Sequence, residues 1–373
     1  MIKILFLTHT FDDGGVERNT FQLINTFNQN SVNNFDIRVV SLLGKGPFYD
    51  PAFCQCLMPV ALNVQKMRKS KWILYPLILI FLPYLVYQLN QYLKKERPNI
   101  ICTNMWLADI LGIWIGHKNE YKTIAIQHDI VKINPLFAWL KRKSLRSADQ
   151  IVAVSNCTKT FLINYFKTPE SKITVIYNGV DYNKFEYSHK NLEAKALVLG
   201  TVAKLDKIKR HIDVLNALLI LRKRKIQLPP YIIVGNGPEN TYLQGLVKKH
   251  GLDNVKFVGE VTDINPWLKQ IDIFILPSIS EGLGIAVIEA MIAKKIIIGS
   301  DIEALRELII NQQTGLLLPP RNPALLADAI DWTLTHPLEA QNLAEAAYDW
   351  IYSHYQTFSN KVSADQYRKL FLA

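Results

Sequence analysis

Short apolar runs alternate with helix-length amphipathic segments along the whole 373-residue chain. Runs of this kind suit strands that are buried on both faces, and the segments between them suit helices that cover a parallel sheet. The polar stretch 181–193 has little periodicity and separates two series of runs. The pattern therefore predicts two α/β domains, residues 1–185 and 186–354. The expected strands are Lys3–Leu7, Asp36–Ser41, Asn99–Thr103, Lys122–Ile126, Gln150–Val154 and Ile173–Ile176 in the first domain, and Ala196–Val202, Tyr231–Val234, Lys256–Val258, Ile271–Leu276, Ile296–Gly299 and Gly315–Leu318 in the second.

The composition is that of a globular protein with a basic surface. Lysine and arginine number 43 against 32 acidic residues, which gives a formal net charge of +11. Such a charge suits phosphorylated substrates, anionic lipid surfaces or polyanions. The four cysteines lack the paired spacing of a zinc site, so we expect reduced thiols. The apolar run at the N-terminus is too short for a signal peptide, and we expect a cytoplasmic protein.

Two carboxylates bracket a glycine-containing turn in the second half of the chain. Glu281 follows the expected strand Ile271–Leu276, and Glu289 lies seven residues beyond it in an apolar segment that begins after Gly282 and Gly284. Ligands of parallel sheets bind at the carboxyl ends of the strands, and a glycine turn at a helix start favours phosphate. The glutamates would then bond hydroxyls beside the phosphate. The alternative is an acidic first helical turn without a ligand.

Three more candidate sites, with four residues, follow expected strands. Gly15 precedes a helix with apolar periodicity, His128 follows the fourth expected strand, and Lys204 and Lys209 follow the seventh. Fixed cations stabilise the charge that develops when a nucleoside diphosphate leaves. The alternatives are a capped glycine turn, a structural histidine and a solvated basic loop.

These motifs occur in the order and at the spacings of the retaining GT-B glycosyltransferases of the group 1, or family four, type, which the chain resembles over essentially its whole length. The residues that carry the resemblance are Gly14-Gly15-Val16-Glu17-Arg18, His128, Asn178-Gly179-Val180-Asp181, Lys204 with Lys209, and Glu281 to Glu289, which correspond to the family's E-x7-E motif. The chain departs from the family pattern at Lys204, where arginine is usual, and at Arg210, where glycine is usual. It also departs at Lys294-Lys295-Ile296-Ile297-Ile298-Gly299, where the family usually has a glycine and a proline that enter the next strand. The family also has a glycine just before an acidic residue in the next segment, and this glycine is missing from the segment Asp301–Glu307.

The resemblance implies an α/β fold of the GT-B type. Such a fold has two Rossmann-like domains, with parallel sheets that face each other across a cleft. The second of two terminal helical segments, at about 355–373, is implied to cross back to the first domain.

The resemblance also implies transfer of a sugar from a nucleotide-sugar donor, a UDP or GDP sugar, to a hydroxyl of a glycan or lipid-linked acceptor, with retention. Synthesis of cell-surface polysaccharide, lipopolysaccharide or glycolipid is the implied setting. By this resemblance, Lys204 and Lys209 stabilise the leaving diphosphate, and the backbone of Gly282, Leu283, Gly284 and Ile285 assists them. Glu281 binds sugar hydroxyls, Glu289 binds the ribose, and Val258 borders the nucleotide base. His128 contacts the transferred sugar, and Gly15 lies on the acceptor side. The alternatives are a nucleotide-sugar epimerase of the same fold and an inactive sugar-binding scaffold.

We expect the reaction to need no metal and no other cofactor. The sequence has no D-x-D motif, and the lysines can supply the positive charge that a metal would provide. We also expect no nucleic acid among the partners.

Residues 66–97 are basic at both ends and apolar and aromatic between them. The apolar core carries two prolines and is short for a membrane span. One hypothesis is a helix that lies on an anionic membrane, which would make the protein peripheral to the inner face of the cytoplasmic membrane. The other is a helix that packs on the first sheet. A second basic and apolar surface is expected at residues 136–146.

Overall fold

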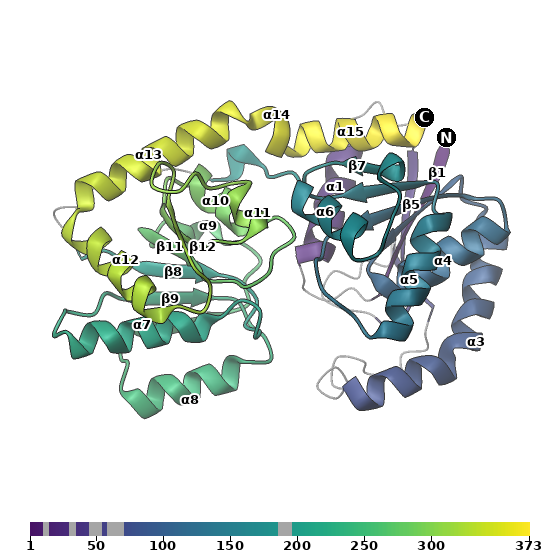
Figure 1. Ribbon diagram of the computed structural model, residues 1–373. Helices are drawn as coiled ribbons and strands as arrows, with labels where there is room; N and C mark the ends of the chain where they lie inside the picture. Colours follow the sequence, from purple (N-terminus) through teal and green to yellow (C-terminus); the bar gives the residue numbers. More distant parts are fainter. Residues whose placement is uncertain (10–14, 30–34, 45–53, 58–70, 186–195) are drawn as a thin grey trace. The chain divides into compact units, whose positions relative to one another are not determined.

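The protein divides into two compact units, shown in Figure 1. The computed structural model describes residues 1–9, 15–29, 35–44, 54–57, 71–185 and 196–373. The first unit comprises residues 1–179 and 360–373, and the second comprises 180–359. The linker predicted from the sequence, 181–193, belongs to the second unit where it is described.

The first unit contains a parallel sheet with the strand order β3-β2-β1-β4-β5-β6-β7. All six strands predicted for this half are confirmed, while the edge strand β3 was not predicted. The strands are β1 (Ile2–Thr8), β2 (Phe35–Ser41), β3 (Cys54–Cys56), β4 (Ile100–Asn104), β5 (Lys122–Gln127), β6 (Gln150–Ala153) and β7 (Ile173–Val175). Because β1 lies between β2 and β4, the order of the strands reverses there, and the carboxyl ends of β1 and β4 mark the expected ligand edge.

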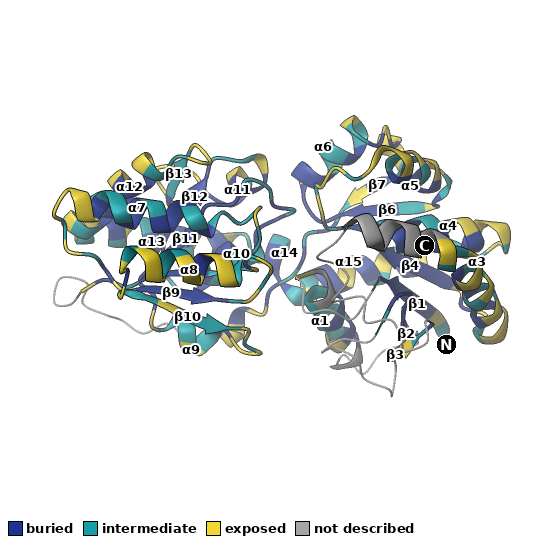
Figure 2. Ribbon diagram, turned by 90° about the horizontal axis from the view of Figure 1, so that it is seen from below, coloured by how far each residue is buried: buried dark blue, intermediate teal, exposed yellow. Residues whose placement is uncertain are grey.

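Helices cover both faces of this sheet. They are α1 (Gly15–Gln29), α3 (Lys71–Glu96), α4 (Trp106–Lys118), α5 (Pro135–Ser147), α6 (Asn156–Asn164) and α15 (Asn360–Leu372). Alternate side chains of β1 divide between two cores: Ile4 and Phe6 pack with α1 and α15, whereas Leu5 and Leu7 pack with α3 and α4. Figure 2 shows the resulting buried strands between more exposed helices.

The helix predicted to return to the first unit does so. Tyr367 and Phe371 of α15 are buried in the core of the first unit, and the ring of Phe371 meets that of Phe6 edge to face at a centroid distance of 6.5 Å. The first unit is therefore completed by residues that follow the second unit in the chain.

Helix α3 occupies most of the basic and aromatic segment. Leu85, Leu89 and Leu93 are buried in the core that also contains residues of β1, β4 and α4, so the hypothesis of a helix packed on the sheet is confirmed for this part. Tyr84 and Tyr87 are exposed on the same helix. Residues 66–70 lie outside the described part of the chain. No helix among the described residues is long and apolar enough to cross a membrane.

The second unit has a parallel sheet with the order β10-β9-β8-β11-β12-β13. All six strands predicted for this half are confirmed. Its elements are β8 (Leu199–Val202), α7 (His211–Lys223), β9 (Tyr231–Val234), α8 (Asn240–His250), β10 (Val255–Gly259), α9 (Asn265–Leu268), β11 (Ile273–Leu276), α10 (Ile285–Ile292), β12 (Ile296–Ser300), α11 (Glu303–Arg306), β13 (Leu316–Leu318), α12 (Pro323–Thr335), α13 (Pro337–Ser353) and α14 (Tyr355–Phe358). Here the strand order reverses at β8, which lies between β9 and β11.

The chain passes between the units at two neighbouring points. In the second unit, the backbone N–H of Val180 donates to the carbonyl of Phe358 at 2.8 Å. In the first unit, a Cβ atom on Gly179 would lie 2.4 Å from the Cα of Asn360. Only glycine permits this approach, which explains the Asn-Gly pair that the sequence places at this turn.

Candidate active site

The candidate residues of the second unit gather around the switch point of its sheet. Lys204 and Lys209 follow β8, and Glu281 follows β11, the strand that pairs with β8. Carboxyl ends of neighbouring parallel strands meet at one edge of the sheet. Residues far apart in the sequence therefore come together here, as predicted for a ligand site.

The central contact of this group joins Lys209 and Glu281. The Nζ of Lys209 donates to both carboxylate oxygens of Glu281, at 2.7 Å to Oε1 and 2.6 Å to Oε2. Glu281 is only 8% exposed, and a buried carboxylate needs a charged partner or several donors. The lysine ammonium has three N–H groups, so one remains for another acceptor. The sequence had suggested separate roles for these residues and had not indicated that they are paired.

The loop before α7 holds Lys209 in place. Asp206 Oδ1 accepts hydrogen bonds from the backbone N–H groups of Ile208 and Lys209, at 3.0 and 3.1 Å. The carbonyl of Ile208 accepts from the N–H of Ile279, which lies two residues before Glu281. The two backbone segments that carry the ion pair are thus hydrogen-bonded to each other, which reduces the freedom that the lysine must lose on binding a ligand.

The turn between Glu281 and α10 has the backbone geometry that glycine allows. Gly284 has φ 90° and ψ 50°, and α10 begins at the next residue, Ile285. A Cβ on Gly284 would lie 2.8 Å from a methyl group of Leu305, so the position excludes side chains for two reasons. Helix α10 has Gly284 at its N-cap position, and this residue has no side chain with which to cap the helix. Its first N–H groups are therefore suited to an anionic ligand.

The remaining predicted residues lie where the sequence suggested. Glu289 is half-buried within α10, Lys204 is exposed after β8, and Val258 is half-buried near the end of β10. Gly15 and His128 belong to the first unit, where Gly15 is the exposed first residue of α1 and His128 follows β5.

His128 is half-buried at the carboxyl end of β5, and its Nε2 atom is buried. Burial, helped by the positive charge of Lys141, lowers the pKa of His128 to about 4. The ring is therefore neutral at physiological pH and can act as a hydrogen-bond donor or acceptor without carrying charge. Its Nδ1 lies 3.5 Å from the amide nitrogen of Asn178.

A buried ion pair near His128 was not predicted. Asp109 of α4 accepts from Thr103 Oγ1 at 2.7 Å, from Gln127 Nε2 at 3.0 Å and from Lys141 Nζ of α5 at 3.0 Å. Asp109 is fully buried, and Gln127 immediately precedes His128. The sequence signal for this ion pair was Asp109 itself, a carboxylate in the first turn of an otherwise apolar helix.

His211 gives the second unit a testable sensitivity to acid. This side chain is 1% exposed, and burial lowers its pKa to about 4, below the ordinary value of 6.5. The unfolded chain binds a proton at His211 below pH 6.5 whereas the folded chain does not, so stability is lost as the pH falls from 6.5 toward 4. We expect a loss of about 1.4 kcal/mol per pH unit from this group in that window.

Chemical denaturation at a series of pH values checks this expectation. His211→Gln should have a shallower dependence on pH than the parent, and His117→Gln, which changes an exposed histidine of α4, should not. Equal slopes for the parent and His211→Gln would contradict a neutral buried His211.

Two parallel α/β units, with an anion-suited glycine turn beside a lysine–glutamate pair in the second, define a protein of the GT-B class. The Anabaena protein HepE, solved in complex with UDP and glucose, has this fold: the TM-score is 0.78 at 20% identity, and the match covers 100% of both chains.

Sequence comparison identifies the family. Residues 183–350 match the family "Glycosyl transferases group 1", and residues 13–184 match "Glycosyltransferase Family 4". A glycogen synthase of Mycobacterium tuberculosis is 30% identical over 281 residues, which cover 69% of this chain and 67% of the relative. The O-antigen biosynthesis glycosyltransferase WclY of Escherichia coli is 28% identical over 231 residues, 60% of this chain and 61% of the relative. The chain belongs to the group 1, family four glycosyltransferases.

Proposed function

We propose that this chain transfers a sugar from a nucleoside-diphosphate sugar to an acceptor hydroxyl with retention of configuration, in the synthesis of a cell-surface polysaccharide, lipopolysaccharide or glycolipid. The observation that carries the proposal is the bidentate contact of Lys209 with Glu281 beside the turn that begins α10. Matches to relatives that synthesise O-antigen and glycogen support the setting. UDP in the HepE structure supports a UDP sugar, with a GDP sugar as the other choice.

The ion pair suits a site that must hold both hydroxyls and phosphates. Lys209 neutralises Glu281, so a diphosphate beside this carboxylate meets no net negative charge. The third N–H of Lys209 is available for a phosphate oxygen, while the remaining lone pairs of Glu281 can accept from sugar hydroxyls. In this proposal Lys204 supplies a second cation, Glu289 holds the ribose, and the backbone at Val258 borders the base.

The proposed reaction needs no side-chain base. The bond between the anomeric carbon and the phosphate oxygen breaks, the acceptor oxygen bonds to that carbon, and the acceptor proton passes to an oxygen of the departing phosphate. Positive charge on Lys204 and Lys209, together with the N–H groups from Gly282 to Ile285, stabilises the charge that develops on the diphosphate. His128 and Gly15 are assigned to the transferred sugar and the acceptor side.

A screen of UDP-, GDP- and ADP-sugars without acceptor tests the proposed function. We expect slow release of nucleoside diphosphate from one donor, and lower release by Lys209→Ala with that donor. Conversion of the sugar without release of nucleotide would identify an epimerase instead. Binding without turnover, even after addition of glycan and lipid-linked acceptors, would identify a sugar-binding scaffold.

The reaction is expected to proceed without a divalent ion. Because Lys204, the third N–H group of Lys209 and the N–H groups from Gly282 to Ile285 are proposed to stabilise the diphosphate, turnover in EDTA should equal turnover in magnesium within about twofold. Loss of activity on chelation, with recovery on addition of magnesium or manganese, would overturn this expectation. The assay uses the donor that the screen identifies.

The proposed partner at the surface of the first unit is an anionic membrane, which makes the protein cytoplasmic and peripheral. Ile80, Tyr84 and Tyr87 are exposed along α3, and Lys94 and Lys95 are exposed in its last turn. Aromatic rings and lysines side by side suit the interface of a bilayer. On α5, Trp139 is also exposed, with Lys143 Nζ 5.8 Å from its ring centroid.

Vesicle flotation tests this partner with a matched control. Reversal of Lys94 and Lys95 to glutamate should weaken binding to phosphatidylglycerol vesicles by at least about tenfold, since each lysine near an anionic surface contributes roughly 1 kcal/mol. Lys248 and Lys249 form an equivalent exposed pair in the last turn of α8, and their reversal should have a much smaller effect. Equal effects of the two reversals would show that net charge alone governs binding.

A further inference from the structure

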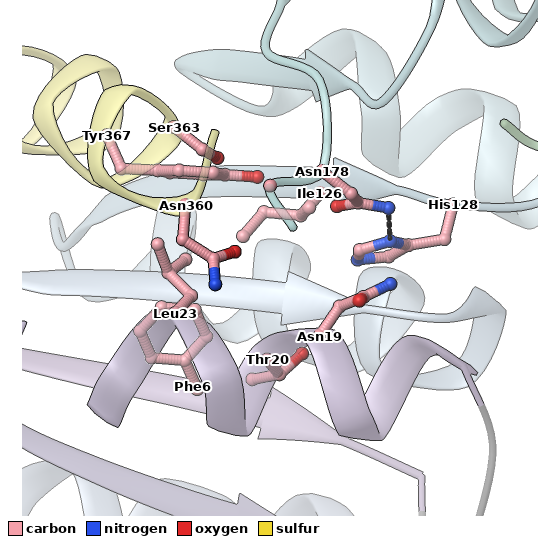
Figure 3. Close-up of a pocket in the computed structure, with 11 residues that line it drawn as sticks. Phe6, Asn19, Thr20, Leu23, Ile126, His128, Asn178, Asn360, Ser363 and Tyr367 are labelled. Carbon is pink, nitrogen blue, oxygen red and sulfur yellow. Dashed lines mark hydrogen bonds between the residues drawn. The ribbon is translucent and has the colours of Figure 1, made fainter. Parts of the chain in front are cut away.

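A small polar cavity lies within the first unit, beside His128. Figure 3 shows it between strands β1 and β5, helix α1 and the start of α15. Its volume is about 20 Å³, which is room for one water-sized group. The polar part of its lining comprises Asn19, Thr20, His128, Asn178, Asn360 and Ser363, with the hydroxyl-bearing Tyr367.

One nitrogen of His128 lacks a partner at this cavity. The Nε2 atom is buried, and no described residue hydrogen-bonds to it. Buried polar atoms of native proteins are nearly always paired with protein or water. The cavity beside the ring therefore has the size and polarity to supply the missing partner to Nε2.

The other nitrogen of His128 indicates where the proton lies. Nδ1 faces the amide nitrogen of Asn178 at 3.5 Å, the contact drawn as a dashed line in Figure 3. An amide NH₂ group can only donate, so Nδ1 must present its lone pair. In a neutral imidazole the proton then lies on Nε2. The ring thus offers an N–H donor on the side where its partner is missing.

Charged groups around the ring favour the neutral form. Lys141 of α5 lowers the pKa of His128 together with burial, and Lys141 itself pairs with Asp109 of α4. Of the described residues that line the cavity, none carries a full charge. An uncharged oxygen is therefore the acceptor that suits the Nε2–H group.

The backbone fixes Asn178 in position. This residue is 8% exposed and precedes Gly179, where a Cβ would collide with the backbone of Asn360. Its burial and the close approach of Gly179 to Asn360 restrict the movement of Asn178. The sequence had suggested only a turn-forming role for this Asn-Gly pair.

We propose that Asn178 is a positioning residue, which holds His128 as the Nε2–H tautomer so that this N–H donates to a single uncharged hydroxyl oxygen in the cavity. In the free protein the oxygen is that of a water molecule. In the substrate complex it is a sugar hydroxyl, an assignment that rests on the proposed function.

Nuclear magnetic resonance of the full chain labelled with ¹⁵N-histidine tests the tautomer directly. The parent should show a protonated Nε2 and an unprotonated Nδ1 for His128, with the signal assigned by its loss in His128→Gln. Asn178→Asp has nearly the same shape but an acceptor in place of the donor, so Nδ1 of His128 should become protonated. Asn164→Asp, an exposed change at the last residue of α6, should leave the His128 signals unchanged.

Three outcomes would overturn the proposal. They are a proton on Nδ1 in the parent, an unchanged tautomer in folded Asn178→Asp, and identical His128 signals in the parent and Asn178→Ala. Asn178→Ala should give a mixture of tautomers. This variant keeps the proposal testable if Asn178→Asp does not fold. Near-ultraviolet circular dichroism confirms that each variant is folded.

The two sources of the hydroxyl are separated by titration with the donor found in the screen. Binding of a sugar hydroxyl should shift the Nε2 signal of His128 at saturating donor. An unchanged signal would show that a water molecule is retained and would contradict the assignment of a sugar hydroxyl. Failure of every donor to turn over would contradict the proposed function while leaving the tautomer measurement valid.

Discussion

Replacement of Lys209 by alanine is expected to reduce turnover of the nucleotide-sugar donor by about 10²- to 10³-fold, the effect of removing one fixed donor from developing negative charge. The loss should fall mainly on kcat, because the charge on the diphosphate grows as the bond breaks. The variant also leaves Glu281 as a buried carboxylate without its cation, which places an uncompensated negative charge beside the leaving group.

Lys207 provides the control for this prediction. It is an exposed lysine in the same loop, so Lys207→Ala removes the same charge from the same segment and should change turnover less than about twofold. Lys209→Arg keeps the charge but replaces a compact ammonium by a planar fork, and we expect intermediate activity. Similar losses for Lys207→Ala and Lys209→Ala would show that Lys209 contributes only as one of several positive charges in this loop.

The second large effect is expected on stability. Lys141→Met should destabilise the first unit by about 3–5 kcal/mol, because it leaves the carboxylate of Asp109 buried without its cation. Burial already raises the pKa of Asp109. Without the opposing charge of Lys141 that pKa rises further, so the loss should shrink at acid pH as the carboxylate takes up a proton.

A double-mutant cycle separates the pair from simple packing. Asp109→Asn combined with Lys141→Met removes both charges and should recover much of the stability that the single change loses. The exposed pair of Arg224 and Asp328 is the comparison, since its disruption should cost no more than about 1 kcal/mol. A cost for Lys141→Met similar to that of the exposed pair would show that water reaches Asp109.

Strands were predictable because local composition determines them. The central predicted strands are continuous apolar runs that are buried on both faces, as in Ile273–Leu276, and turns and amphipathic helices separate these runs. The short edge strand Cys54–Cys56 gave no such run, with one residue exposed and only Cys54 buried. Helix α3 was ambiguous for the opposite reason, since its apolar residues continue around the helix rather than along one stripe.

The ion pairs could not be read from local spacing. Lys209 and Glu281 were both selected as candidates, but the contact between them is made by a sheet that places the ends of β8 and β11 together. Asp109 and Lys141 lie on separate helices, and only the packing of α4 on α5 shows that one neutralises the other. Asn178 was attributed to a turn because the position of His128 beside it depends on the fold of the whole unit.

The division of the chain into units also sets an order of completion during synthesis. Residues 180–359 form a continuous unit that can close as soon as it has been made. The first unit begins earlier but ends later, because Ala364, Tyr367 and Phe371 cover the face of the sheet that contains Ile4 and Phe6. Helix α1 packs on the same face, but the part that α15 covers remains exposed until α15 has been synthesised. A translation product that stops between the units would thus lack part of the core of its first domain.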